Sequence, residues 1–202
     1  MGGATAQDTM AQALALLRPE MKAGGYAKRG ATFHRMTEHG TRVLFGLQRS
    51  RSSTRECVQV ALNYGVFSPL LKERLGEDFL SGLDVASAQW SSRFHGHGDD
   101  HWWSVLATDD PASHAATFLA AIDATLPLVV AFSSHEALRD MWTSDHINNT
   151  LARALLYAVV LHHEIGPRDT LPELLARMRA EVRGSRSEPV FEEYLRRAGV
   201  TS

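Results

Sequence analysis

The chain has 202 residues, of which 44% are hydrophobic and 22% are charged, and its formal net charge is −2 at pH 7. These values are those of ordinary globular proteins. A chain of this length buries roughly 70% of the surface that it exposes when unfolded, so neither disulfides nor structural metals are needed for stability. The small net charge gives no general reason to expect nucleic acid or an anionic membrane as a partner.

Three further features concern the cellular compartment. Cys57 is the single cysteine, which excludes an internal disulfide and fits a reducing environment. The sequence contains no run of 18 apolar residues, so we expect no membrane-spanning segment. Residues 1–12 lack the basic and apolar pattern of a secretory signal. We therefore expect a cytoplasmic protein.

The charges are unevenly distributed. Residues 18–55 contain nine Lys or Arg and two Glu, whereas residues 56–150 contain four Lys or Arg and thirteen Asp or Glu. We interpret these as two segments that face each other in the fold. The alternative is a basic patch on residues 18–55 for phosphate, an acidic protein or nucleic acid.

The spacing of apolar residues predicts a helix, then strands, then further helices. The period is helical up to Gly24, changes to two between Thr32 and Phe67, and returns to about 3.6 after Pro111. Asp110 suits the N-cap of the helix that follows, and Pro111 suits its first helical position. The expected helices are 6–23, a short one after residue 68, one from 111, bent at Pro127, and 135–143, 148–164, 170–183 and 187–198. The expected strands are 32–36, 41–49, 56–67, 86–94 and 101–107.

Alternation within the third strand separates two faces of the sheet. Its apolar face carries Val58, Val60, Leu62, Tyr64 and Val66, and its other face carries Gln59, Ala61, Asn63 and Gly65. The order of elements predicts an α+β fold with an antiparallel sheet of four to five strands flanked by helices, and a helical C-terminal segment. We expect residues 1–145 to form the sheet domain and residues 146–202 to pack on it as one structural unit.

Several short patterns follow one another in the order found in a known family. They are residues 24–30 (Gly-Gly-Tyr-Ala-Lys-Arg-Gly), residues 45–50 and 62–68, Arg93, Asp100, Trp102–Trp103 and Leu126–Pro127. With this ordered set, over roughly residues 10–145, the chain resembles the bacterial family called domain of unknown function 4304. It departs from the family at Gly46, where the family pattern has Asn, and in the long connection at residues 69–84. The resemblance supports the fold and implies no activity, cofactor or partner.

Two clusters of histidines contain residue types that bind metal ions. His95, His97 and His101, with two aspartates between them, resemble the zinc signature of metallo-β-lactamase-like hydrolases. The last histidine comes one residue too late, and a strand pattern follows where that signature needs a helix. We therefore expect a polar hairpin loop without a metal site, and weak zinc binding by the three histidines is the alternative.

The second cluster is His162-His163-Glu164 at the end of a predicted helix. Adjacent residues on a helix point about 100° apart, so these histidines do not share a metal. We expect them to be protonated there, because a helix C-terminus favours a positive charge. The sequence also contains no nucleophile elbow, no Cys–His signature and no glycine-rich nucleotide loop, so we predict no catalytic residue and no cofactor.

The preferred site is the polar face of the sheet. Small residues on this face would admit a ligand close to the backbone, and amides and a guanidinium would offer directed hydrogen bonds. Trp90, Trp102 and Trp103 would form its wall. The predicted ligand-binding residues are Gln48, Gln59, Asn63, Gln89, Arg93 and Trp103. The alternative is an ordinary solvated sheet face with the tryptophans in the core.

From this site we predict a non-enzymatic binding protein whose partner is a protein or a small anionic ligand. The alternative is a hydrolase-like or transferase-like enzyme acting on a small anionic substrate, with Arg93 binding the anion and a histidine of residues 95–101 as general acid or base. The helices after Asn148 would serve a homodimer as well as the core. We expect neither nucleic acid nor a membrane as partner.

Overall fold

A computed structural model describes residues 4–76, 84–95, 101–144 and 151–200. The first helix, α1, covers Ala6–Ala23 as predicted. It begins with a capping box, in which the Thr5 side chain accepts from the backbone N–H of Asp8 and the Asp8 carboxylate accepts from that of Thr5. It ends at Gly24, and Gly25 follows with a φ of 80°, a conformation that glycine adopts without steric cost.

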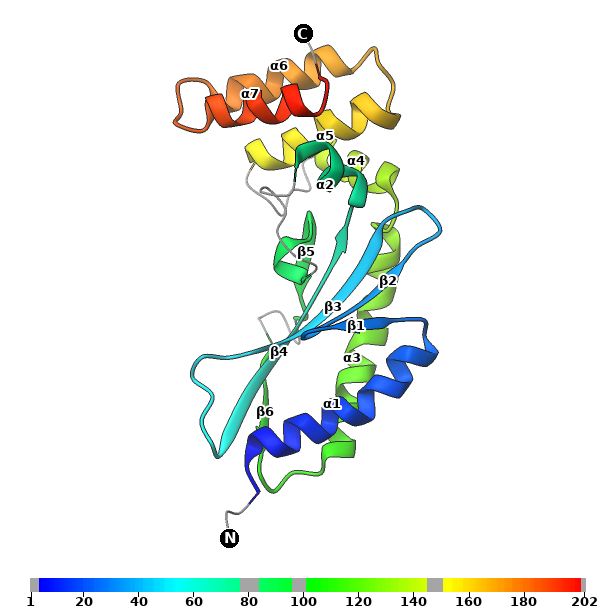
Figure 1. The fold of residues 1–202 in the computed structure, drawn as a ribbon, viewed down its shortest axis with the longest axis vertical. Coiled ribbons are helices and arrows are strands. Elements are labelled where there is room, and N and C mark those ends of the chain that lie inside the picture. The colour runs from blue at the N-terminus through cyan, green and yellow to red at the C-terminus, as the bar shows by residue number, and fades with distance from the viewer. Residues whose placement is uncertain (1–3, 77–83, 96–100, 145–150, 201–202) are drawn as a thin grey trace.

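The strands form one antiparallel sheet, and the fold is α+β as predicted (Figure 1). The strands are β1 (Ala27–Arg29), β2 (Thr32–Met36), β3 (Arg42–Arg49), β4 (Cys57–Phe67), β5 (Trp90–Arg93) and β6 (Trp103–Leu106). β1 to β4 pair in chain order, and β5 and β6 both pair with β4, at successive stretches of its length.

Two strands differ in detail from the prediction. β1 was not expected, because its three residues are all exposed and therefore show no apolar alternation. β5 is shorter than the predicted strand at 86–94, because Val85–Ser87 form a 3₁₀ turn, η1, capped by the side chain of Asp84. Both differences arise from short segments in which tertiary contacts override the local pattern.

The two faces of the sheet are covered differently. Helices α1 and α3 (Pro111–Ala131) pack on the face that carries Val58, Val60 and Leu62, as Figure 1 shows. The opposite face carries a separate small cluster of Leu44, Phe67 and Val85, with η1 lying over it. The predicted core face is therefore present, and the opposite face is mixed, with small and polar residues beside this apolar cluster.

Helix α3 is long and apolar enough to cross a membrane, with a mean hydropathy of 1.6 over an 18-residue stretch that is 28% buried. The sequence predicted no membrane-spanning segment, because Asp123 interrupts the apolar run of this helix. Core helices of soluble proteins have the same composition, and α3 packs on α1 and β4 through Phe118, Ile122 and Val129, which are buried. Length and composition alone are thus weak support for a membrane span.

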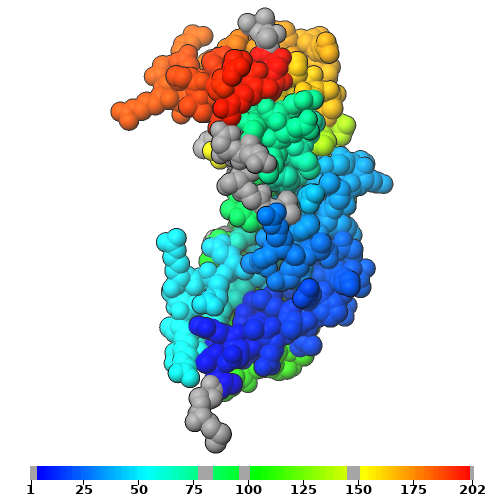
Figure 2. All heavy atoms as spheres, in the orientation of Figure 1, coloured from blue at the N-terminus to red at the C-terminus, as the bar shows by residue number. Residues whose placement is uncertain are grey.

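The remaining helices lie together at the end of the molecule opposite the N-terminus (Figures 1 and 2). They are α2 (Pro69–Leu75), α4 (His135–Thr143), α5 (Leu151–Ile165), α6 (Leu171–Val182) and α7 (Glu188–Arg197). α5 lies at their centre, with an unbroken run of buried residues from Ala154 to His162. The predicted boundary at residues 145 and 146 lies outside the described residues, and one hydrophobic core includes residues from α1 through to α7.

Candidate functional site

The polar face of the sheet brings together three of the predicted residues from three strands. Asn63 on β4 pairs with Arg93 on β5 in the strand register, and Gln48 on β3 lies diagonally across from Asn63. The Asn63 amide donates to Gln48 Oε1 at 2.7 Å. Arg93 donates from Nη2 to the same oxygen at 3.0 Å and from Nε to Asn63 Oδ1 at 2.9 Å.

These contacts fix the direction of the Arg93 guanidinium. Both amide oxygens accept from the guanidinium, and the Gln48 oxygen also accepts from the Asn63 amide nitrogen. The two amides therefore act as a cradle for the cation. Trp102 adds a third side, since the guanidinium carbon lies 5.1 Å from the centre of its ring, a favourable cation–π distance. We call Gln48, Asn63, Arg93 and Trp102 the polar sheet site.

The polar sheet site borders a cavity of about 470 Å³. Ser91, Ser92, His95 and residues 85 and 86 of η1 complete its described lining, which includes no Asp or Glu. Gln48 is exposed, and its amide nitrogen can still donate. The cavity thus offers a positive charge and hydrogen-bond donors, which suits a ligand with carboxylate or phosphate oxygens.

The small residues of this face have a different role from the predicted one. A Cβ added to Gly65 would lie 2.5 Å from the Trp90 carbonyl oxygen and 3.0 Å from the Cβ of Ala88. A Cβ added to Gly46 would lie 3.1 Å from a methyl group of Val85. The glycines therefore admit the chain's own segment at 85–90 rather than a ligand.

The structure places the other three predicted residues away from the polar sheet site. Gln59 lies on β4 near the β3–β4 loop, and its side chain accepts from the hydroxyl of the loop residue Ser52 at 3.2 Å. Gln89 is 1% exposed, and its Oε1 accepts from the backbone N–H of Ser68. Trp103 faces the helices, with its ring centre 5.5 Å from that of Phe118. All three therefore lie outside the polar sheet site.

Of the three tryptophans expected to form the wall, Trp102 lies against Arg93. β6 begins at Trp103, whose partner Val60 belongs to the core face. Trp102 precedes the strand, so alternation does not determine the direction of its side chain. A conformation outside regular structure lets Trp102 reach Arg93, and no periodic signal in the sequence reports it.

The loop histidines lie in different surroundings. His95 lines the cavity of the polar sheet site, whereas His101 packs with its ring centre 4.7 Å from that of Trp103. His97 lies outside the described residues. Within the described part of the chain, no group of three His, Cys, Asp or Glu residues could hold a metal ion.

A serine–histidine contact was not anticipated. His135 Nε2 lies 2.9 Å from Ser68 Oγ, a distance at which a histidine could activate a nucleophile. Ser68 is fully buried, however, and its Oγ accepts from the backbone N–H of Leu71 as the N-cap of α2. No substrate carbonyl can reach this oxygen, so the pair serves to fix α4 against α2.

The expectation for His162 is wrong. His162 is only 7% exposed, and burial, together with the nearby positive charge of Arg139, lowers its pKa below the usual value. The ring is therefore neutral near pH 7 rather than stabilised as a cation at the helix end. Glu164, two residues later, forms an ion pair with Arg74 and ties α5 to α2.

Comparison with known proteins identifies one match. The model of the family described as Domain of unknown function (DUF4304) matches residues 17–131, more than half of the chain. No curated protein and no solved structure matches. The matched segment contains all four residues of the polar sheet site and ends with the last residue of α3.

Proposed function

We propose that this chain, which belongs to the family described as Domain of unknown function (DUF4304), is a cytoplasmic, non-enzymatic protein that binds an acidic segment of a partner protein at the polar sheet site. A side-chain or C-terminal carboxylate of the partner would meet the Arg93 guanidinium. The amide nitrogen of Gln48 would donate a second hydrogen bond.

The observation that carries this proposal is the network of Gln48, Asn63 and Arg93. Two hydrogen bonds and the Trp102 ring hold the guanidinium in one direction before a ligand arrives, and a third hydrogen bond, between Asn63 and Gln48, fixes the two acceptors. Preorganised groups lose less conformational entropy on binding, which is a general feature of recognition sites. Arg93 contributes a positive charge to the lining of the cavity, and a positive charge favours an acidic segment.

The test is selection of a displayed random-peptide library on the folded protein, followed by fluorescence anisotropy on the selected peptides. We expect these peptides to be rich in Asp and Glu or to require a free C-terminus. Arg93→Gln should weaken binding by about tenfold or more, because hydrogen bonds to charged groups contribute about 1.5–3 kcal/mol. Arg49→Gln removes the same charge from an exposed position beside Gln48 and should leave binding unchanged.

Equal affinity of the wild type and Arg93→Gln for the selected peptides would contradict the proposal. Circular dichroism should first establish that both variants are folded. A selection without charge preference would count against an acidic partner.

The enzymatic alternative rests on one observation, which is that His95 lines the same cavity as Arg93. In that case Arg93 would bind a small anionic substrate and His95 would act as general acid or base. Turnover of phosphate or carboxylate esters by the wild type, lost in His95→Gln with peptide binding intact, would favour this function over the first.

A further inference from the structure

A second cavity, of about 390 Å³, lies where the end of α1 meets β1 at the edge of the sheet (Figure 1). Its volume falls within the range of small-molecule sites, roughly 300–1,000 Å³. Three cations line it, which are Arg18 and Lys22 of α1 and Lys28 of β1, and its described lining includes no Asp or Glu. We call it the basic cavity. It shares no residue with the polar sheet site, so its interpretation is independent of the function proposed above.

The cations of this part of the chain have no carboxylate partners. Residues 18–55 contain nine Lys or Arg, and none of the nine forms an ion pair within the part of the chain that the structure describes. By contrast, Arg179 pairs with Glu192 at 2.8 Å on the C-terminal helices. The basic and acidic segments of the sequence are therefore not joined by ion pairs among the described residues, and the positive charge of residues 18–55 stays open to a ligand.

Two of the cations lie on one face of α1. Arg18 and Lys22 are four residues apart, so their side chains are neighbours, and both are exposed. Like charges at this spacing destabilise a helix. Glu20 lies between them in the sequence, but residues two apart on a helix do not face each other. The helix dipole favours a cation in the last turn, which accounts for Lys22 but not for Arg18.

Strand β1 brings the third cation to the same opening. Lys28 is opposite Phe33 in the register of β1 and β2, and Phe33 belongs to the core face. Because the side chains of directly opposite residues lie on one side of a sheet, Lys28 lies on the side that α1 covers. Its Nζ donates to the Gly30 carbonyl at 2.7 Å, which restrains the side chain and leaves two N–H groups for a ligand.

The turn between α1 and β1 fixes the relative positions of these cations. The N–H of Gly25 donates to the Lys22 carbonyl at 3.0 Å, and that of Tyr26 donates to the Met21 carbonyl at 2.9 Å. Gly25 has a φ of 80°, which glycine adopts without steric cost. The Tyr26 ring is buried and packs edge-on against Phe45. β1 therefore begins directly beside the end of α1, and the basic cavity has a rigid aromatic base.

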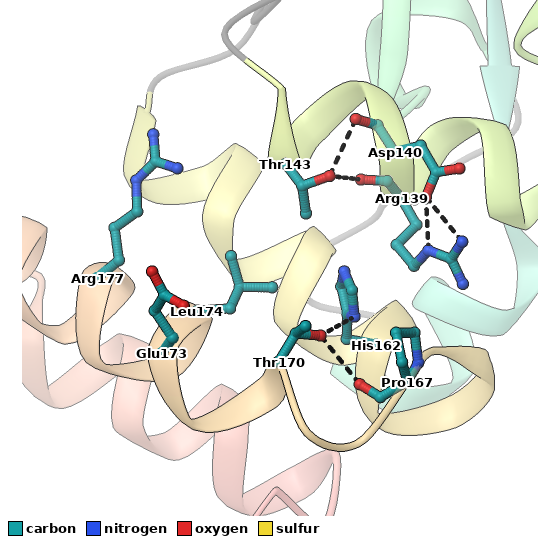
Figure 3. A pocket seen from close by; sticks show the side chains of 9 residues that line it. All are labelled: Arg139, Asp140, Thr143, His162, Pro167, Thr170, Glu173, Leu174 and Arg177. Atoms are coloured by element: carbon teal, nitrogen blue, oxygen red, sulfur yellow. Dashed lines mark hydrogen bonds and ion pairs between the residues drawn. The ribbon is translucent and has the colours of Figure 1, made fainter.

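The cavity between α4, α5 and α6 has a different character (Figure 3). Its volume is about 300 Å³, and its lining contains charged residues of both signs. Arg139 pairs there with Asp140 at 2.7 Å, so the chain itself neutralises this cation. The described lining of the basic cavity carries charge of one sign only, which favours an anionic ligand.

We propose that the basic cavity binds a small molecule through a phosphomonoester group. Such a group carries a charge of about −1.5 to −2 at pH 7 and has three acceptor oxygens. The guanidinium of Arg18 would donate to two of these oxygens, and the ammonium groups of Lys22 and Lys28 would donate to the third and to the outer lone pairs. At about 390 Å³ the cavity also has room for the organic part of the ligand, which would lie over Tyr26.

The test uses the full chain and three soluble probes, which are inorganic phosphate, glycerol 3-phosphate and phenyl phosphate. Isothermal titration calorimetry measures binding, and phenyl sulfate, a monoanion, is the matched control ligand. We expect phenyl phosphate to bind about tenfold or more tightly than phenyl sulfate. Its affinity should rise as the pH increases through about 6, where a phosphomonoester loses its second proton.

Matched variants locate the site. Arg18→Gln should weaken the binding of phenyl phosphate by about tenfold or more, whereas Arg29→Gln should not change it. Arg29 is exposed and follows Lys28 on β1, so its side chain lies on the other side of the sheet. Without phosphate, Arg18→Gln should melt no lower than the wild type, because it removes a like-charge contact from α1. Arg93→Gln should leave the binding of phenyl phosphate unchanged, since it alters only the polar sheet site.

Three outcomes would overturn the proposal. The first is that neither glycerol 3-phosphate nor phenyl phosphate binds to the wild type. The second is that Arg18→Gln binds phenyl phosphate as tightly as Arg29→Gln does, or that Arg93→Gln abolishes the binding. The third is that the chain binds vesicles containing phosphatidic acid but none of the soluble probes, which would assign the cavity to a lipid headgroup.

Discussion

Gly65 sets the position of β5, and Gly65→Ala should therefore damage both stability and the polar sheet site. The new Cβ would lie 2.5 Å from the Trp90 carbonyl oxygen, about 1 Å inside ordinary van der Waals contact. That atom belongs to the backbone of β5, so the strand itself has to move. Overpacking of this kind costs typically about 1–3 kcal/mol, reduced by about 0.4–1 kcal/mol because alanine restricts the unfolded chain. The net cost is up to about 2.6 kcal/mol, and for a chain of this size we expect Tm to fall by up to about 10 °C.

Gly46→Ala is the matched control for this prediction. Its Cβ meets only the methyl group of Val85, at 3.1 Å, and a side-chain tip can yield more cheaply than a strand backbone. Urea and thermal unfolding of the two variants should therefore rank Gly65→Ala as the less stable. Since Arg93 lies on the displaced strand, Gly65→Ala should also weaken binding of acidic peptides. If Gly65→Ala is as stable as Gly46→Ala, the assigned role of this close approach is wrong.

Three further predictions concern titration, capping and the tryptophan pair. Burial lowers the pKa of three histidines, which are His34, His135 and His162. The unfolded chain takes up protons at a pKa near 6.5, whereas the folded chain takes them up only at a lower pH. The stabilisation is therefore complete above pH 6.5 and is lost as the pH falls through the lowered pKa values of the three histidines. A urea midpoint that does not change between pH 7 and 5.5 would contradict this. Ser68→Ala should cost about 1–3 kcal/mol in urea unfolding, because it removes the cap of α2 and the partner of His135, whereas Ser113→Ala, at an exposed helix start, should cost little. Trp102→Ala should weaken peptide binding with a small effect on Tm, because its ring contacts Arg93. Trp103→Ala should lower Tm more, because its ring contacts the core. The reverse order of the two effects on Tm would refute the placement of these rings.

The sequence predicted those parts of the fold that repeat with a regular period. The bounds of α1 and α4 agree with the predicted helices, and β2 agrees with the first predicted strand, because caps, glycines and alternation are local signals. β1 and η1 were missed because each has only three residues and too short a pattern. Their conformations depend on pairing with β2 and on contact with β3 and β4, which no local window contains.

The same reasoning explains which site residues could be predicted. Gln48, Asn63 and Arg93 lie within regular strands, where alternation determines the face on which each side chain lies. Gln89 and Trp102 lie just before strands, so the rule fails for both of them. His162 was misjudged because its burial depends on α4 and α6, which pack on α5 from other parts of the chain.

Two close contacts in this chain depend on a glycine that carries no chemistry of its own. Gly65 lets β5 approach β4 closely enough for Arg93 to meet Asn63, and Gly166 lets the His162 ring fold back against the end of α5. In each case a Cβ would displace backbone or a buried ring, so the polar groups would remain in the sequence while their geometry was lost. Family members that keep Asn63 and Arg93 but replace Gly65 should therefore lack the cradle of the polar sheet site. Gly166 lies outside the segment that matches the family, and its replacement in this chain should displace the buried His162 ring. The identity of Gly65 is a stricter criterion for the polar sheet site than the polar residues themselves.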